Sequence, residues 1–409
     1  MNAPRAPLRP LDDALAELLA QARVLEGSDI VSTFEGDGRV LQAGLVSSLQ
    51  VPPQDNSSMD GYAVRSAEIA DEGVVLPVSQ RVPAGAAARP LQPGTAARIF
   101  TGAPVPEGAD ALVMQEDTQP AGDNHVRILQ VPQPGEWIRR SGEDVRRGAV
   151  VLAAGERLGP AALGLAASIG VDRLTVARRP RIALFSTGDE LVMPGEVPPE
   201  RMRPGAIYNS NRFFLRALLL RLGCEVIDHG IVPDDRQATL AALQSAARGS
   251  DLILTSGGVS VGEEDHIKPA VQQLGSLDLW QIAIKPGKPF AYGRVGAAHF
   301  IGLPGNPVSS FVTFVLLVRP FLLKLQGATR LAPQPILLPA HFELPRGDKR
   351  REFLRAQRNA EGGLDLFANQ SSGVLTSAVW GDGLVDNPPG RSILRGDPVR
   401  FLPFAELLA

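Results

Sequence analysis

The sequence predicts a multidomain protein in which a doubly wound α/β domain is joined to two β-rich domains and an elongated linking domain. The first observation is length, because 409 residues exceed what one hydrophobic core usually organises. The second is a regular alternation of strand-like and helix-like segments between residues 181 and 325. The third is a pattern of short β-rich pieces separated by Pro and Gly on either side of that region. The predicted parts are the linking domain (1–47 and 149–178), the inserted β-rich domain (48–148), the α/β domain (179–327) and the C-terminal β domain (328–409).

The linking domain is predicted from two helical segments that lie far apart in the sequence. Residues 11–26 place Leu11, Leu15, Leu18, Leu19 and Ala22 on one helical face, which is typical of an amphipathic packing helix. A second helix, at 160–170, precedes a strand at 172–177. If the two helices pack together, the β-rich region between them is an insertion.

The α/β domain is predicted from strands that end in loops and are followed by helices. Strands begin at residues 181, 224 and 251, helices occupy 209–223, 238–249 and 268–275, and further strands lead to a long helix at 308–325. In a doubly wound sheet, ligands bind outside the carboxyl ends of the strands. The loops with unusual composition in this region all fall at that edge.

One such loop combines two kinds of ligand-binding group. The buried strand at 252–255 ends at Ser256, Gly257 and Gly258, where the backbone can adopt positive φ and approach a ligand closely. The acids Glu263, Glu264 and Asp265 follow within ten residues. This combination indicates a phosphate and its Mg²⁺. A Gly pair is also common at any strand-to-helix turn, and acids in a first helical turn are favoured by the helix dipole alone.

Further acids follow the neighbouring strands. Asp189 and Glu190 lie in the loop at 186–191, and Asp234 lies in the loop at 232–235. Together with the acids above, they can surround one Mg²⁺, although each acid by itself is more typical of a helix cap.

Two lysines mark another loop of the same domain. The chain has only five Lys, and Lys285 and Lys288 flank a Pro-Gly turn, so their ammonium groups can reach a common oxyanion. The segment at 304–310, PGNPVSS, opens the long helix, whose first N–H groups suit an anion. The alternative interpretation of this segment is a rigid turn that caps the helix.

Composition limits the remaining classes of function. The 41 basic and 44 acidic side chains give a net charge of −3, which indicates neither nucleic acid nor a membrane surface as a partner. The single Cys224 excludes a disulfide within the chain and fits a reducing cytosol. The most apolar stretch, 311–325, is interrupted by Arg319 and Pro320. We therefore predict a soluble, cytoplasmic protein.

Seven segments in order carry a family resemblance. They are DNSSMDGYAVR, IFTGAPVPEGAD, GEDVRRGAV, STGDEL, TSGGVSVGEED, IKPGKP and GLPGNPVSS. The first of these reads, by composition alone, as an ordinary Asx-rich turn. Taken together, the segments closely resemble the bacterial molybdopterin molybdenumtransferase family, and a similar module occurs in a plant protein of the same role and in gephyrin. The resemblance covers nearly the whole chain.

The resemblance implies a four-domain, elongated homodimer whose third domain has the molybdopterin-binding fold. The implied reaction takes adenylylated molybdopterin and molybdate as substrates, uses a divalent metal, expected to be Mg²⁺, and releases AMP. It also implies an active site in a cleft between subunits and transient contact with a molybdopterin adenylyltransferase.

The resemblance also implies roles for particular residues. The implied catalytic residues are Asp60, Thr101, Asp144, Glu190, Asp234 and Asp265, of which Glu190, Asp234 and Asp265 would hold the metal. The implied substrate-binding residues are Arg139, Ser256, Gly257, Gly258, Lys285, Lys288, Pro304, Gly305, Asn306, Ser309, Arg351 and Ser372. Gln281 departs from the family pattern, because relatives often carry a Lys after the Trp at this place.

Two rival functions fit parts of the same pattern. A molybdopterin adenylyltransferase would use the third domain alone, and a non-catalytic cofactor-binding scaffold would use the same pocket without releasing AMP. The Asp60 motif, the inserted β-rich domain and the Lys285/Lys288 pair favour molybdenum insertion.

Overall fold

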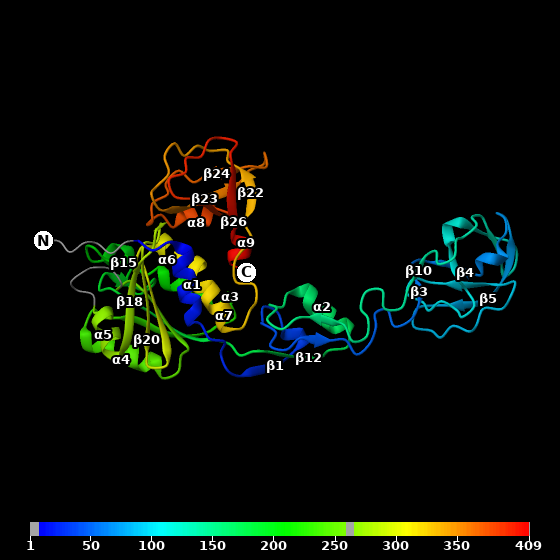
Figure 1. Ribbon diagram of the computed structural model, residues 1–409, viewed down its shortest axis with the longest axis horizontal. Coiled ribbons are helices and arrows are strands. Elements are labelled where there is room, and N and C mark those ends of the chain that lie inside the picture. The colour runs from blue at the N-terminus through cyan, green and yellow to red at the C-terminus, as the bar shows by residue number, and fades with distance from the viewer. Residues whose placement is uncertain (1–7, 259–265, 409) are drawn as a thin grey trace.

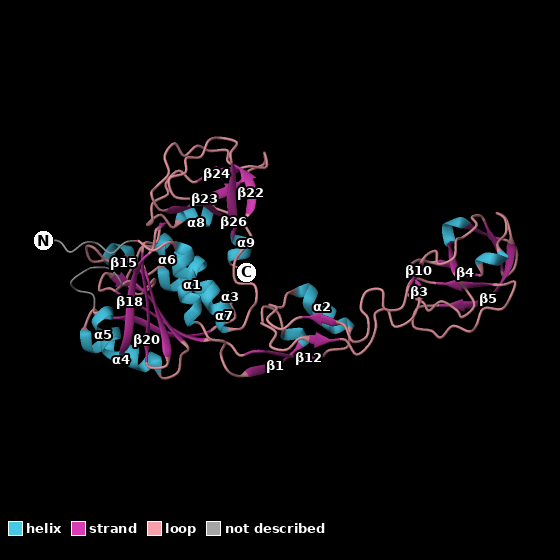
Figure 2. Ribbon diagram, viewed as in Figure 1, coloured by secondary structure: helices cyan, strands magenta, loops and turns pink. Residues whose placement is uncertain are grey.

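The computed structural model describes residues 8–258 and 266–408 and has an elongated shape (Figure 1). An α/β body and a β domain above it lie at one end, a small domain containing α2 (Pro160–Ser168) lies in the middle, and a second β domain lies at the other end. Figure 2 shows that helices concentrate in the α/β body, whereas the two outer domains consist mainly of strands and loops.

The linking domain is built from two segments that pair across the insertion. Strand β1 (Ser28–Ser32) pairs with β12 (Arg173–Ala177), and β2 (Leu45–Val46) pairs with β11 (Val150–Leu152), both antiparallel. Helix α2 packs on this pair of ladders around Leu41, Leu174 and Val176. The chain therefore leaves the linking domain after β2 and returns at β11, as expected for an insertion.

The inserted domain is a β structure with its own core. Its sheet has the order β7 (Ala111–Met114), β4 (Gly61–Val64), β6 (Ala96–Ile99), β5 (Val75–Val82), β9 (His125–Ile128) and β8 (Thr118–Pro120). A short ladder joins β3 (Asn56–Ser57) to β10 (Ile138–Arg139). At the neck, the Val51 amide donates to the Val145 carbonyl at 2.7 Å, and the Val145 amide donates back at 3.1 Å.

The α/β domain contains a mixed six-stranded sheet. The order is β16 (Glu225–Val232), β13 (Arg181–Thr187), β17 (Leu252–Ser256), β21 (Ala298–Leu303), β20 (Pro289–Val295) and β18 (Gly275–Gln281). The first four strands are parallel, whereas β20 pairs antiparallel with β21, and β18 pairs antiparallel with β20.

Side-chain alternation on this sheet explains why both of its faces are covered. Along β13, Ile182 and Leu184 join one buried cluster, whereas Ala183 and Phe185 join another. The first cluster includes residues of α3 (Asn211–Arg221), α6 (Pro307–Thr313) and α7 (Arg319–Leu325), and the second includes residues of α4 (Arg236–Ala247) and α5 (Ile267–Leu274). The predicted doubly wound fold is confirmed, with an antiparallel edge that the sequence pattern did not reveal.

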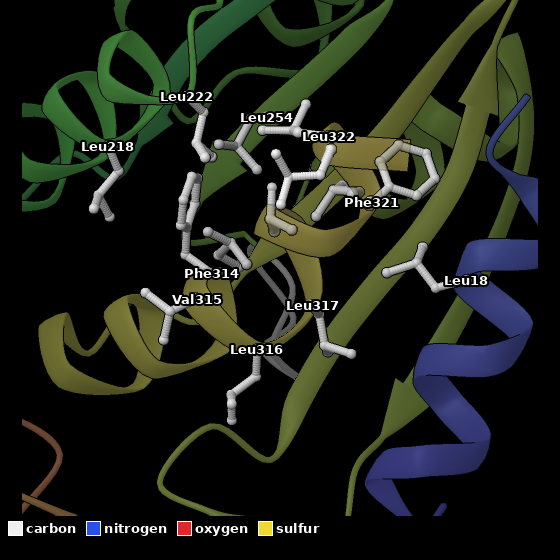
Figure 3. Close-up of a cluster of buried hydrophobic side chains, with 14 of the residues drawn as sticks. Leu18, Leu218, Leu222, Leu254, Phe314, Val315, Leu316, Leu317, Phe321 and Leu322 are labelled. Carbon is white, nitrogen blue, oxygen red and sulfur yellow. The ribbon is translucent and has the colours of Figure 1, made fainter. Parts of the chain in front are cut away.

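The N-terminal helix and the helix at 160–170 do not pack together. Helix α1 (Leu11–Gln21) does not pack against α2 but buries Leu11, Ala14 and Leu18 in the main core of the α/β domain. Figure 3 shows Leu18 on α1 facing the helix that carries Leu317 and Phe321. The amphipathic pattern of α1 correctly predicted that one face of the helix is buried. Periodicity does not identify which part of the protein covers that face.

The long helix runs without a break from Pro307 to Leu325, so Arg319 and Pro320 do not end it. A π-helical turn, Phe314–Val318, lies immediately before these two residues, and it adjusts the backbone where Pro320 lacks a donor. By length and composition this is the one helix in the described part of the chain that is suited to cross a membrane. However, 89% of its apolar window is buried inside the protein, as in a core helix.

The C-terminal domain forms a sheet in the order β19 (Ile284–Lys285), β23 (Arg351–Arg358), β25 (Gly383–Asn387), β26 (Pro398–Pro403) and β22 (Ile336–Pro339). Strand β24 (Leu364–Leu366) also pairs with β23, at Ala356–Arg358, in the antiparallel direction. Because β19 belongs in sequence to the α/β domain, the two domains share hydrogen bonds at the Lys285 loop.

Candidate active site

The main candidate site lies at the point where the strand order of the α/β sheet reverses. From β13 the chain crosses to β16 on one side, whereas β17 lies on the other side, so the loops after β13 and β17 diverge. The two strands end in register, with Ser186 opposite Ser256. A pocket of about 590 Å³ opens there. Its lining is Thr187, Glu190, Leu191, Ile207, Tyr208, Asn209, Ser210, Asn211, Ser256, Gly257, Pro289, Pro304, Gly305, Asn306, Pro307, Ser309 and Gly373.

The glycines after β17 are required by close packing. Gly257 and Gly258 have φ values of +91° and +66°, which disfavour other residues. A Cβ on Gly258 would lie 2.6 Å from Ile267 Cγ1, and one on Gly257 would lie 3.0 Å from the Thr187 carbonyl oxygen. The Gly257 amide is already used, because it donates to the Leu303 carbonyl at 3.0 Å. Gly257 therefore contributes space rather than a free N–H group.

Asn211 connects three loops of the pocket, and sequence reasoning missed it. Its side-chain amide donates to the Gly305 carbonyl at 2.7 Å and to the Ser256 hydroxyl at 3.3 Å. Nearby, Asn209 is 2% exposed, lines the pocket, and has a buried Nδ2 without a hydrogen-bond partner among the described residues. The signal was the segment Asn209–Ser210–Asn211 before a helix, which reads as ordinary capping.

The acids after β13 and β16 approach one another. The Asp234 amide donates to Asp189 Oδ1 at 3.3 Å. Burial, together with the negative charge of Asp189 and then of Glu190, raises the pKa of the Asp234 carboxyl. In contrast, Asp235 caps α4 by accepting from the Ala238 amide at 2.8 Å. Capping therefore explains Asp235 but not Asp234.

The predicted metal ligands are only partly within the described chain. Asp265 lies outside the described residues, as do Glu263 and Glu264. Between residues 8 and 258 and between 266 and 408, no three His, Cys, Asp or Glu side chains group closely enough to hold a metal ion. The donor chemistry nevertheless suits Mg²⁺, because Asp189, Glu190 and Asp234 are carboxylates whose mutual repulsion a cation would relieve.

The start of the long helix faces the C-terminal domain. The Val308 amide donates to the Ser372 carbonyl at 2.9 Å, and Gly373 lines the pocket. The predicted residues Pro304, Gly305, Asn306, Ser309 and Ser372 are therefore brought together. The Ser310 hydroxyl, buried in the same first turn, has no partner in the described part of the chain.

Lys285 is held by two carboxylates. Its Nζ lies 3.1 Å from Glu352 Oε1 and 3.3 Å from Asp348 Oδ2, and it lines a separate cavity of about 550 Å³ with residues 346–350. Although partial burial opposes it, the hydrogen bond to Glu352 and the charges of both acids raise the pKa of Lys285. Lys288, by comparison, makes no side-chain hydrogen bond or ion pair with any described residue.

Arg351 is likewise held by acids. Its guanidinium makes a two-pronged pair with Asp386, at 2.6 and 2.7 Å, and also binds Asp12 of α1 at 3.0 Å. These contacts raise the pKa of Arg351. The role of Arg351 in substrate binding stays a prediction, and an oxyanion there would meet a guanidinium already paired with Asp386 and Asp12.

A second group of predicted residues lies in the inserted domain. Asp60 Oδ1 accepts from both the amide and the hydroxyl of Thr101, each at 2.8 Å. These two bonds, the amide first, lower the pKa of the exposed Asp60 carboxyl. Arg139 and Asp144 are also exposed, and their side chains have no partner in the described chain.

The two groups of residues are far apart within one chain. The inserted domain, with β3, β4 and β10, lies at the opposite end of the molecule from the α/β domain (Figure 1). The structure therefore joins Asp60 to Thr101, and Glu190 to Ser256 and the 304–309 loop, but it does not bring these sets into one pocket within a single subunit.

Comparisons with known proteins cover nearly the whole chain. Family models match at residues 9–170 (MoeA N-terminal region, domains I and II), 183–324 (probable molybdopterin binding domain) and 338–404 (MoeA C-terminal region, domain IV). The chain is 42% identical to a molybdopterin molybdenumtransferase of Haemophilus influenzae, over 97% of this chain and 99% of that protein. It is 35% identical to one of a Nostoc species, over 96% and 92%.

A solved structure supports the same relationship. The crystal structure of the molybdopterin biosynthesis moeA protein from Pyrococcus horikoshii superposes with a TM-score of 0.83 at 28% identity, covering 97% of this chain and all of that one. The relationship extends to a gephyrin from Dictyostelium discoideum, which is 32% identical over 78% of this chain and half of that protein. These matches agree with the pocket at the point where the strand order reverses and with the inserted β domain. They show that the chain belongs to the molybdopterin molybdenumtransferase (MoeA) family.

Proposed function

We propose that the protein inserts molybdenum from molybdate into adenylylated molybdopterin and releases AMP, as a step in molybdenum cofactor biosynthesis. One observation carries the proposal: the pocket formed by Ser256, Asn211 and the 304–309 loop lies inside the region that matches a molybdopterin-binding domain. The near-complete similarity to transferases of that name supports it.

The pocket residues would bind the pterin and its phosphates. Gly257 and Gly258 let the loop after β17 pack closely against Thr187 and Ile267, and Ser256 and Asn211 fix the pocket wall. Pro307 has no N–H and the Val308 amide donates to the Ser372 carbonyl, so the first turn of the long helix would direct its dipole and the Ser309 amide toward a phosphate.

The acids would hold the divalent metal. Glu190 and Asp234, with Asp265, are the proposed ligands, and Mg²⁺ bound there would supply charge neutralisation beside the phosphoanhydride. The raised pKa of Asp234 supports this assignment, because a bound cation would stabilise its charged form.

The molybdate site is assigned to Lys285, Lys288, Arg351 and Ser372. Lys288 is without a side-chain partner in the described chain, whereas Lys285 and Arg351 are held by carboxylates. An oxyanion would therefore have to compete with Asp348 and Glu352 for Lys285. If these residues hold molybdate, replacing both lysines raises the molybdate requirement more than it weakens pterin binding, and equal effects would argue against that role.

We further propose that the protein works as a homodimer whose cleft brings Asp60, Thr101, Arg139 and Asp144 of one subunit to the α/β pocket of the other. The distance between the two groups within one chain supports this arrangement. Mixing Asp60→Ala chains with Asp234→Ala chains should restore part of the activity through hybrid dimers. No recovery, with hybrid formation demonstrated, would indicate a site within one chain.

Incubation of the purified protein with adenylylated molybdopterin, Mg²⁺ and molybdate tests the function. The proposed enzyme yields both AMP and active cofactor, an adenylyltransferase yields no AMP from this substrate, and a scaffold binds the pterin without turnover. The proposed setting is cytoplasmic, where a molybdopterin adenylyltransferase would deliver the substrate by transient contact.

A further inference from the structure

A second, strongly basic pocket lies at the junction of the linking domain and the α/β domain. It has a volume of about 790 Å³, and its charged lining consists of Arg39, Arg157, Arg179, Arg221, Arg319, Arg330 and Asp37. We call it the arginine pocket. It lies where α3 ends, whereas the candidate active site lies where α3 begins, so about 15 Å of helix separates the two.

The arginine pocket has a large excess of positive charge. Six guanidinium groups face one lining carboxylate, Asp37, which is exposed. Among the described residues, only Arg39 of these six makes an ion pair, with Asp29 at 2.6 Å. Like charges gathered in a partly buried cavity repel one another, and a multivalent anion would relieve that repulsion.

Helix capping accounts for only part of this cluster. The Arg157 guanidinium donates to the Arg221 carbonyl at 2.8 Å, at the C-terminus of α3, where a cation is favourable. Arg179 makes one long bond, of 3.4 Å, to the Gly223 carbonyl. Carbonyl oxygens carry only partial charge, so these contacts leave most of the positive charge uncompensated.

Arg319 provides the second observation. It is 9% exposed and donates to the carbonyls of Leu331 and Glu406 at 3.0 and 2.9 Å, while its Nε is buried without a partner in the described chain. Burial, followed by the positive charge of Arg157, lowers the pKa of Arg319. A buried donor left unpaired beside a second cation is costly unless a ligand accepts from it.

The rim of the pocket supplies two further guanidinium groups. The side chains of Arg221 and Arg330 are exposed and make no hydrogen bond or ion pair with a described residue. Planar guanidinium groups bind phosphate oxygens in a two-pronged manner. We propose that the arginine pocket binds a multivalent phosphate anion, of the pyrophosphate or polyphosphate class, and that this anion braces the linking domain against the α/β domain.

Hydrogen–deuterium exchange of the full-length protein with inorganic pyrophosphate tests this proposal. Pyrophosphate should slow exchange at residues 37–39, 157–160 and 220–223. The variant Arg221→Ala/Arg330→Ala should lose this protection, with a dissociation constant at least about tenfold weaker by calorimetry. The matched control, Arg173→Ala/Arg216→Ala, removes the same charge from exposed positions outside the pocket and should bind as the unaltered protein does.

The outcomes separate the possible occupants. Loss of protection in the Arg221/Arg330 variant alone, with an unchanged melting temperature, supports the proposal. Inorganic phosphate should protect the same segments less, because it reaches fewer of the guanidinium groups. Equal binding by both variants, or protection confined to the pocket around Ser256, would overturn the proposal. Protection that depends on protein concentration but not on pyrophosphate would also overturn it, in favour of an acidic surface of a second copy.

Discussion

Replacing Asn211 with Ala should loosen the candidate active site, because this side chain ties the loops after β17 and β21 to the start of α3. The substitution removes a 2.7 Å bond to the Gly305 carbonyl and a 3.3 Å bond to the Ser256 hydroxyl. Gly305 is exposed, so water can replace the first bond, but Ser256 is only 4% exposed and its hydroxyl would lose its partner. One lost net hydrogen bond and one unsatisfied buried hydroxyl together cost about 2 kcal/mol.

Native-state hydrogen exchange measures this cost locally, which suits a multidomain chain whose global unfolding is not two-state. The Gly257 amide, bonded to Leu303 at the pocket edge, should exchange about 30-fold faster in Asn211→Ala, whereas amides of the inserted domain should be unaffected. Asn209→Ala is the matched control, because it removes only a 3.3 Å bond from the Arg212 amide and should cost under about 1 kcal/mol. Equal exchange at Gly257 in the two variants would refute the assignment of Asn211 as the connecting residue.

Three further predictions concern charged groups. Asp60→Asn should reduce AMP release at least about 100-fold. The melting temperature should stay unchanged, because the carboxyl is exposed and its hydrogen bonds are to Thr101. Near-normal turnover would remove Asp60 from the site. Folding raises the pKa of Asp234, so the charged carboxylate destabilises the native state at pH values above that pKa. The variant Asp234→Asn should therefore increase the urea midpoint of the α/β domain at pH 7. The same variant should lose Mg²⁺-dependent activity. This gain should decline as the pH falls below the raised pKa of the folded state and vanish below the ordinary pKa of an unfolded Asp, and a lower midpoint at pH 7 would contradict the electrostatic argument. A double-mutant cycle between Lys285→Met and Glu352→Gln should give a coupling of about 0.5–1 kcal/mol, reduced by the exposure of Lys285, and additive effects would show that the 3.1 Å pair is not energetically linked.

Local pattern was sufficient where one segment determined its own structure. The alternation from β13 to the long helix predicted the doubly wound domain, and the Pro- and Gly-punctuated segments predicted the two β domains. Cys224, which has apolar neighbours in the sequence, is 2% exposed, and burial raises the pKa of its thiol to about 12. In each case, neighbouring residues along the chain supplied the decisive information.

Features that depend on distant segments were not predictable in the same way. Three such features depend on residues that are far apart in sequence. They are the packing of α1 against the α/β core, the pairing of Arg351 with Asp12 and Asp386, and the contact of Lys285 with Glu352. The motifs selected the loops around Ser256 and Asn306, which line one pocket, because glycine and helix-start residues have local signatures. Asn211 escaped notice because its function in the pocket comes from a hydrogen bond across the fold.

The pairing of β1 with β12 in the linking domain constrains the order in which the parts of the protein can fold during synthesis. Strand β1 cannot form its ladder until β12 has been synthesised, because Ser28 pairs with Ala177. The entire inserted domain is synthesised between these two strands. The ends of that domain meet at Val51 and Val145, so it can close on itself while the ribosome is still translating the linking domain. The inserted domain is therefore expected to fold first. Its paired ends at Val51 and Val145 then bring β2 and β11 together, so that the linking domain can complete its ladders.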